Sequence, residues 1–197
     1  MGRVIVITGT PGVGKTVVSK ALAKKLGALY VSLTDVVKKE NLVLRVDEKR
    51  NTLIVDMRQL SKKVCEIIGN STAETVVEGH YATDVVPSSL VSYVFVLRRD
   101  LDDLKTTLKD RGYEEKKVLE NLAAEALDVC LFSAVQRYGD LKVDEIDVTH
   151  LDVVEVVEEI YQVLTGQKTV KVGKIDWLGK LEREGRLEEF LQQFTFL

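Results

Sequence analysis

Gly9-Thr10-Pro11-Gly12-Val13-Gly14-Lys15-Thr16 follows an apolar run, Val4 to Ile7, and precedes a helix-like run from Val17 to Leu26. The stretch matches the pattern G-x-x-x-x-G-K-[ST] in the strand-then-helix setting that this pattern requires. Its glycines let backbone N–H groups converge on an anion, and the helix that follows adds the positive end of its dipole. A plain glycine-rich turn would not need the lysine–threonine pair, so the sequence predicts a phosphate-binding loop.

The same loop predicts which residues touch a nucleotide and its metal ion. Lys15 is expected to face solvent without a ligand and to place its cation on the outer phosphates of ATP, and the Thr16 hydroxyl is expected to ligate Mg²⁺. The residues expected to contact the nucleotide are Gly9, Pro11, Gly12, Val13, Gly14, Lys15, Thr16 and Val17.

The composition is that of an ordinary globular chain. Its 197 residues, 45% of them hydrophobic and 30% charged, fit one domain with a small appendage. The net charge of -3 indicates neither a nucleic-acid nor a membrane partner. Cys65 and Cys130 lie in apolar helical patterns and are expected to be reduced, a disulfide between them being the alternative. Because no signal peptide and no membrane-spanning run is present, we expect a cytoplasmic protein.

Strand-like runs alternate with helical patterns, which predicts an α/β fold with a parallel sheet and helices on both faces. The expected strands span residues 3–8, 28–31, 74–78, 91–97 and 145–148. The expected helices span residues 14–26, 35–40, 57–68, 100–110, 114–138 and 152–164, and Thr34 is expected to cap the second. Two β-rich pieces, 42–46 and 52–55, flank a charged stretch and resemble a hairpin or flap.

The chain divides at one plausible boundary, near residues 165–167. Residues 1–165 are expected to form the main domain, and residues 166–197 a C-terminal extension. Apolar residues recur near helical spacing on either side of Gly185. We therefore expect residues 175–194 to form one or two amphipathic helices that pack on the main domain or on a partner, with disorder as the alternative.

A second candidate site element is the end of the strand at 74–78. An apolar strand that ends in a carboxylate, beside a phosphate loop in a parallel sheet, suits a water-mediated Mg²⁺ site. Glu78 is therefore the candidate metal-side carboxylate, and His80 could orient a water molecule or the terminal phosphate. The alternative is a strand-end glutamate in a salt bridge beside a surface histidine.

Basic residues near two further element ends are candidates for charge neutralisation during phosphoryl transfer. Arg98 and Arg99 follow the fourth strand, and Lys109 and Arg111 precede Gly112, where a short lid could hinge. The alternative is a set of solvated helix ends. Arg111 is the candidate catalytic arginine.

The acceptor side is expected between the second and third strands of the sheet, where small-molecule kinases hold their acceptor. The candidate residues there and at the end of the fourth strand are Asp35, Arg45, Asp56 and Arg98.

Four segments together resemble one family. They are residues 9–16, Val-Val-Glu-Gly-His-Tyr at 76–81, Val-Phe-Val-Leu-Arg at 94–98 and Arg-Gly-Tyr-Glu-Glu-Lys-Lys-Val-Leu-Glu-Asn at 111–121. This pattern is similar to the adenylate kinase isoenzyme six family, adenylate-kinase-like NTPases that also act in maturation of the small ribosomal subunit. The resemblance covers residues 1–165.

The resemblance implies a P-loop NTPase of the nucleoside-monophosphate-kinase type. It implies a five-stranded sheet in the order 2-3-1-4-5, an AMP-site insert at about 32–55 and a short lid at about 110–120. By position, the ATP-binding residues it implies are Gly12, Gly14, Lys15, Thr16 and Arg111.

The chain departs from the family pattern at several points. Val17 stands where a second Thr or Ser is usual, and Glu78-Gly79-His80 stands where Asp-x-His is usual. The insert lacks clear AMP-binding landmarks. The extension, residues 166–197, lies outside the usual family length.

These features predict an enzyme that binds Mg·ATP and either transfers its γ-phosphate to AMP or hydrolyses it. Lys15 and Arg111 would neutralise the transferring phosphoryl group, Thr16 and Glu78 would hold Mg²⁺, and His80 would position the acceptor or a water molecule. Two alternatives are a nucleotide-gated chaperone of a ribosomal protein with little kinase activity and a different metabolite kinase, such as a shikimate-type enzyme.

The resemblance also implies ribosomal partners, namely the basic small-subunit protein uS11 and the small-subunit precursor. Residues 1–165 carry 22 Lys/Arg and 26 Asp/Glu, a net charge of -4. Because an acidic surface repels naked RNA, little direct nucleic-acid binding is expected.

Overall fold

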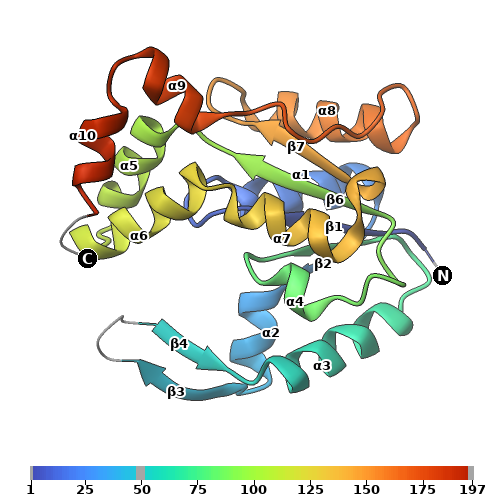
Figure 1. Ribbon diagram of the computed structural model, residues 1–197. Coiled ribbons are helices and arrows are strands. Elements are labelled where there is room, and N and C mark those ends of the chain that lie inside the picture. Colours follow the sequence, from blue (N-terminus) through green and yellow to red (C-terminus); the bar gives the residue numbers. More distant parts are fainter. Residues whose placement is uncertain (1, 48–51, 195–197) are drawn as a thin grey trace.

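A computed structural model of the chain describes residues 2–47 and 52–194 and is built on a five-stranded parallel sheet (Figure 1). The strands of this sheet are β1 (Val4–Thr8), β2 (Leu29–Ser32), β5 (Thr75–Glu78), β6 (Tyr93–Arg98) and β7 (Val143–Asp147). They lie in the order β2-β5-β1-β6-β7, with every neighbouring pair parallel. Numbered along the sheet strands alone, this order is 2-3-1-4-5, so the predicted fold class and strand order are confirmed.

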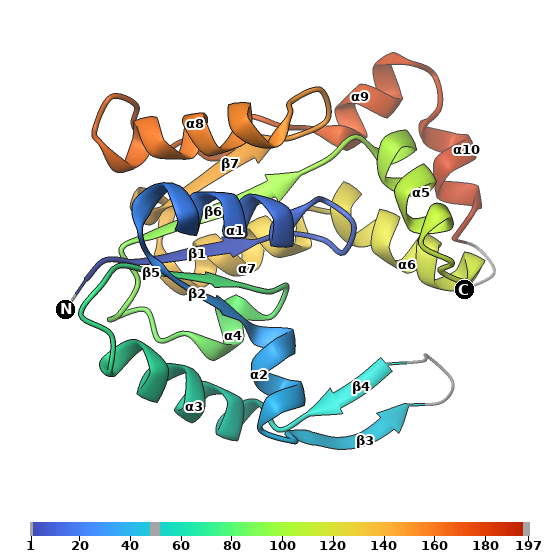
Figure 2. The ribbon, with the colours of Figure 1, turned by 180° about the vertical axis from the view of Figure 1, so that it is seen from behind.

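Helices cover both faces of the sheet, which Figures 1 and 2 show from opposite sides. The helices around the sheet are α1 (Lys15–Leu26), α2 (Leu33–Lys39), α3 (Met57–Gly69), α4 (Ala82–Val85), α5 (Leu101–Asp110), α6 (Glu115–Ala126), α7 (Val129–Tyr138) and α8 (Val153–Leu164). Ile5 and Ile7 pack in the core cluster of α1 and α8, whereas Val4 and Val6 pack in that of α3 and α7. Successive side chains of β1 thus enter opposite cores, as in strands buried on both faces. No helix within the described residues is long and apolar enough to cross a membrane.

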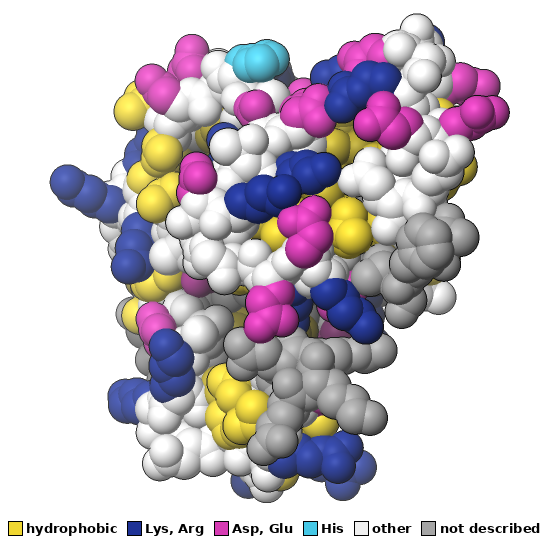
Figure 3. Space-filling model, turned by 90° about the vertical axis from the view of Figure 1, so that its left-hand side faces the viewer, with side chains coloured by type: hydrophobic (Ala, Val, Ile, Leu, Met, Phe, Trp, Pro, Cys, Tyr) yellow, Lys and Arg dark blue, Asp and Glu magenta, His cyan; other side chains and the backbone are white. Residues whose placement is uncertain are grey.

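An antiparallel hairpin of β3 (Val43–Asp47) and β4 (Thr52–Val55) extends away from the sheet, at the lower left of Figure 1. The expected β-rich pieces therefore pair, although residues 48–51 of the charged stretch between them lie outside the described residues. Figure 3 shows hydrophobic side chains in the lower part of the molecule, where the hairpin lies. Its exposed hydrophobic residues are Val43, Leu44, Val46 and Leu53.

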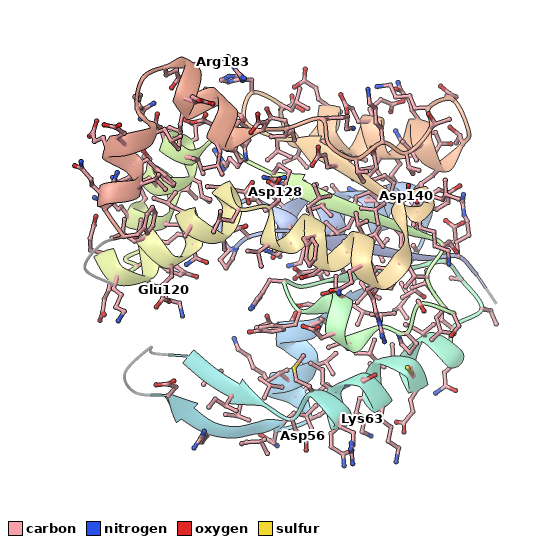
Figure 4. All side chains as sticks on the ribbon, viewed as in Figure 1. Asp56, Lys63, Glu120, Asp128, Asp140 and Arg183 are labelled. Atoms are coloured by element: carbon pink, nitrogen blue, oxygen red, sulfur yellow. The ribbon has the colours of Figure 1, made fainter. Side chains whose placement is uncertain are left out.

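The prediction of one helix over residues 114–138 is wrong, because α6 and α7 are separate helices. Asp128, at their junction (Figure 4), has a left-handed backbone with φ 56°, which interrupts the helical hydrogen-bond ladder. The Asp128 carboxylate lies 2.5 Å from the Arg98 guanidinium, so a long-range ion pair accompanies the local break.

Smaller differences concern helix starts. Ser32, not Thr34, caps α2, because its hydroxyl accepts the backbone N–H of Asp35 at 3.3 Å. The short helix α4 had no counterpart among the expected elements. The sequence pattern over four residues is too short to reveal a helical period.

The C-terminal extension forms two helices, α9 (Trp177–Arg183) and α10 (Leu187–Gln192), on either side of Gly185. Trp177, Leu181 and Phe190 are buried in the core cluster that also contains α1 and α8. Before α9, the extension runs beside β7, where the Glu145 N–H donates to the Lys171 carbonyl at 3.3 Å. The extension therefore shares a hydrophobic core with the rest of the chain.

The packing of α7 against α4 can be tested at Tyr138. Its buried hydroxyl hydrogen-bonds the carbonyls of Ala82 and Val86, at 3.1 and 2.9 Å, and so ties α7 to α4. We expect Tyr138→Phe to lower the free energy of unfolding by about 1–3 kcal/mol, because the carbonyls lose a buried donor. Urea unfolding measures this change. Tyr93→Phe is the matched control, because the Tyr93 hydroxyl makes no hydrogen bond to a described residue; equal effects of the two changes would contradict the assignment.

Candidate functional site

The phosphate loop connects the carboxyl end of β1 to the start of α1 and packs tightly on its neighbours. Gly9 and Gly12 have φ values of 135° and 99°, which disfavour side-chain-bearing residues. A Cβ atom at Gly9 would lie 2.4 Å from the Leu97 carbonyl oxygen, and one at Gly12 would lie 2.8 Å from Leu104 Cδ1. Both glycines are therefore required for the loop to fit against β6 and α5.

Lys15 does not face solvent freely, in contrast to the expectation. Its ammonium donates to the carbonyl oxygens of Gly9 and Thr10, at 2.8 and 2.9 Å. Burial lowers the pKa of Lys15 from 10.5 to about 8, against the opposing effect of Glu78 and other groups. The lysine is thus held across the loop, with its cation over the space that the loop encloses.

Glu78 lies at the carboxyl end of β5, beside the loop, as expected from the parallel sheet. The side chain is buried, and its Oε1 accepts hydrogen bonds from the Thr16 hydroxyl at 3.3 Å and the Tyr30 hydroxyl at 3.1 Å. Burial and the neighbouring Glu78 carboxylate raise the pKa of Tyr30, so Tyr30 remains a proton donor. The structure brings Thr16 and Glu78 together as one oxygen-rich corner.

This corner fits a magnesium ion. A hydroxyl and a carboxylate are the hard oxygen donors that Mg²⁺ prefers, and Mg²⁺ usually completes its shell with water and substrate phosphates. Within the described ranges 2–47 and 52–194, no group of three or more His, Cys, Asp or Glu could hold a metal by protein ligands alone. Thr16 and Glu78 therefore suit an ion that arrives with a nucleotide.

A cleft beside the loop has two parts. The part over the phosphate loop has a volume of about 270 Å³ and is lined by Lys15, Thr16 and Glu78 among others. The second part, of about 440 Å³, lies toward the β3–β4 hairpin and is lined by Val37, Leu53 and Val55 among others. The residues that line both parts are Pro11, Thr34, His80, Arg111 and Tyr113. A phosphate-binding space and a larger, more apolar space therefore meet at His80 and Arg111.

His80 is an exposed residue at the meeting point, and the centre of its ring lies 3.4 Å from the ring centre of Tyr81. The walls of the cleft, and then the cations of Lys15 and Lys117, lower the pKa of His80 to about 4. The imidazole is therefore neutral at pH 7, and it offers one nitrogen that donates a hydrogen bond and one that accepts.

Arg111 caps the end of α5 and is followed by Gly112, whose φ of 75° reverses the chain before α6 begins. The arginine is exposed and lines both parts of the cleft. Lys109 instead forms an exposed ion pair with Glu115 at 3.1 Å.

The expectation that Arg98 binds the acceptor is wrong. Arg98 is 1% exposed, and its guanidinium is engaged by the carboxylates of Glu125, Asp128 and Glu145, at 2.7, 2.5 and 3.2 Å. The Glu125 carbonyl accepts a further hydrogen bond from it at 2.9 Å. A guanidinium held this way has a structural role in the interior and does not reach the cleft.

The other acceptor-side candidates, Asp35, Arg45 and Asp56, do not line either part of the cleft. Asp35 is exposed in the first turn of α2, and Arg45 is exposed on β3. Asp56 caps α3 by accepting the Gln59 N–H at 2.9 Å. Among the described residues, the larger part is lined instead by Pro11, Thr34, Val37, Leu53, Val55, His80, Tyr81, Arg111, Gly112, Tyr113, Glu114 and Lys117.

Sequence reasoning missed Tyr30 as a partner of Glu78. The two meet because β2 pairs with β5, with Ser32 opposite Glu78, and Tyr30 points to the same side two residues earlier. Only knowledge of the strand register could have revealed this contact. Tyr81 and Tyr113 stood inside the recognised segments but received no role.

The arrangement of sheet and loop occurs in solved kinases. Shikimate kinase from Acinetobacter baumannii in complex with shikimate has a TM-score of 0.61 at 17% identity and covers 84% of this chain and 94% of its own. A gluconokinase from Sinorhizobium meliloti 1021 has a TM-score of 0.53 at 17% identity, and the match covers 84% of this chain and 93% of the gluconokinase. The fold and the loop thus define a P-loop protein, and its fold is the one seen in these two kinases.

Sequence relatives narrow this class. The model of a family described as "AAA domain" matches residues 5–128. A "Putative adenylate kinase" from Methanocaldococcus jannaschii is 40% identical over 176 residues, covering 89% of this chain and 93% of the relative. A protein of the same name from Archaeoglobus fulgidus is 33% identical over 193 residues, and the match covers 96% of this chain and 98% of the relative. The chain belongs to this family of adenylate-kinase-like P-loop proteins.

The Archaeoglobus fulgidus relative corrects the expectation that the extension lies outside the family length. Its match covers 96% of the 197 residues and leaves about eight unmatched. Most of the extension, residues 166–197, therefore has a counterpart in that protein.

Lys15 provides the direct test of the phosphate loop. Lys15→Ala removes the cation over the loop, so nucleotide turnover should fall by at least about 10²-fold, the scale of other electrostatic stabilisers. The rate of ADP production from ATP measures this turnover. Lys24→Ala, at an exposed position in the last turn of α1, is the control and should leave turnover unchanged. Unaltered turnover in Lys15→Ala would refute the assignment of the loop.

Proposed function

We propose that the protein transfers the γ-phosphate of ATP to AMP. The observation that carries this proposal is the two-part cleft, in which a phosphate-binding space and a larger space meet at His80 and Arg111. A phosphotransferase needs a donor and an acceptor on opposite sides of one reacting phosphoryl group. The adenylate-kinase-like relatives support a nucleotide as the acceptor.

On the donor side, the loop N–H groups and Lys15 bind the phosphates, and the neighbouring helix N-terminus adds its dipole. Thr16 and Glu78 would hold Mg²⁺, which neutralises phosphate charge when it is bound with ATP. Tyr30 keeps Glu78 oriented through its hydrogen bond. Arg111 neutralises charge that develops on the transferring group, because it lines both parts of the cleft.

On the acceptor side, aliphatic and aromatic side chains suit the purine of AMP. Val37, Leu53 and Val55 line one side of the larger part, and Tyr81 and Tyr113 supply rings. Apolar walls with a few polar groups are typical of small-molecule sites. His80, neutral at pH 7, positions the AMP phosphate at the junction by donating its ring N–H to a phosphate oxygen. Asp35, Arg45 and Asp56 remain predictions for this side.

We further propose a role in maturation of the small ribosomal subunit, through ribosomal protein uS11 and the small-subunit precursor. The segments at 76–81 and 111–121 resemble those of the ribosome-linked family. The net charge of -4 of residues 1–165 favours a basic protein partner over naked RNA. Binding of purified uS11 across a salt series, with and without ATP, tests this role. Binding that weakens with salt and changes with ATP would support it, and absence of binding would refute it.

An acceptor assay tests the enzymatic proposal. With ATP as donor, ADP formation should depend on AMP, stop when EDTA removes divalent metal and return with Mg²⁺ or Mn²⁺. Parallel reactions contain no acceptor, or shikimate. ADP formation that ignores AMP would make the protein an ATPase, and faster formation with shikimate would make it a metabolite kinase; either result would overturn the proposal.

A further inference from the structure

A buried cluster of charged residues lies behind the phosphate loop and takes no part in the proposed chemistry. Its cation is Arg98, and its carboxylates are Glu125 from α6, Glu145 from β7 and Asp128 between α6 and α7. Glu125 and Glu145 are 1% and 0% exposed. Burying a carboxylate costs free energy unless each of its oxygens accepts a hydrogen bond or an ion pair. The groups that donate to these carboxylates therefore identify the segments of the chain that the cluster holds in place.

One of these donors belongs to the phosphate loop. The Thr10 hydroxyl donates to Glu125 Oε2 at 2.5 Å, and Thr10 itself is 1% exposed. The carbonyl oxygen of the same residue accepts a hydrogen bond from the Lys15 ammonium at 2.9 Å. Thr10 is thus held by Glu125 on one side and touches the phosphate-binding lysine on the other. The position of the Glu125 carboxylate therefore bears on the shape of the loop.

A second donor belongs to the C-terminal extension. The indole N–H of Trp177 donates to Glu125 Oε1 at 3.1 Å, next to the Arg98 Nε–H on the same oxygen at 2.7 Å. The neighbouring carboxylate, Glu145, accepts the N–H of Ile175 at 2.9 Å. An ion pair of Lys180 with Asp100, at 2.5 Å, fastens α9 to the start of α5. Both buried glutamates therefore depend on donors from the extension.

We propose that Glu125 is a positioning residue of the phosphate loop, acting through Thr10, and that the C-terminal extension completes the nucleotide site by holding Glu125 through Trp177. This inference rests on the proposed function only in that the loop binds a nucleotide. It does not depend on the acceptor.

Trp177 is the only tryptophan of the chain, so its fluorescence reports on the cluster directly. ADP is titrated into the full-length protein while Trp177 emission is followed, and binding is measured separately by calorimetry. We expect emission to change with the same midpoint as binding, because an occupied loop alters Thr10 and hence the carboxylate that the indole contacts.

Thr10→Val removes the hydroxyl and keeps the side-chain volume. We expect ADP binding to weaken by about tenfold, the scale for a lost hydrogen bond to a charged group, and the Trp177 response to disappear. Thr10→Ser restores the hydroxyl and should restore both. Thr106→Val, at an exposed position on α5, is the matched control and should alter neither. The melting temperature is measured for each variant, so that affinity is compared between folded proteins.

The outcomes separate the two proposals. If Thr10→Val binds ADP as tightly as the unaltered protein, or Trp177 emission does not follow binding, the cluster is only structural and the inference is overturned. If the unaltered protein binds ADP with the expected coupling but does not phosphorylate AMP, only the proposed acceptor is wrong. If it binds no ADP, both proposals fail.

Discussion

The ion pair between Arg98 and Glu125 is the constraint on which much of the structure depends. Both side chains are 1% exposed, with 2.7 Å between Nε and Oε1. A buried pair is tolerated only when its remaining donors and acceptors are satisfied, and removing one partner of such a pair typically costs about 3–5 kcal/mol. That cost is a large part of the stability of a domain of this size. The sheet, the junction of α6 and α7, the phosphate loop and the extension therefore all contribute groups to it.

The parts of the fold that could be predicted are those with a local signal. Val4 to Ile7 is apolar throughout because β1 is buried on both faces, and the loop after it carries its own pattern of glycines, lysine and threonine. Glu78 was found by the same logic, since parallel strands end at one edge of the sheet. The Thr16–Glu78 contact at 3.3 Å follows from that geometry.

The parts that could not be predicted depend on contacts between distant segments. An arginine after a strand has the same pattern whether it reaches a ligand or, like Arg98, is enclosed by three carboxylates. In the sequence, the helical pattern of apolar residues continues through Asp128. The left-handed backbone at Asp128 occurs together with its ion pair to Arg98, a contact between distant segments that the local pattern does not reveal. Tyr30 required the register of β2 against β5. The acceptor side was the hardest part of the site to predict. Its wall is built from side chains of several separate elements, so no fixed spacing in the sequence marks them.

The sequence separation between Thr10 and Glu125, 115 residues, has a consequence for synthesis of the protein. The loop is made before the carboxylate that holds it, by roughly ten seconds at ordinary rates of elongation. Trp177 follows 52 residues after Glu125. The nascent chain therefore carries an unsupported phosphate loop until Glu125 has emerged, and the support is complete only when Trp177 has followed.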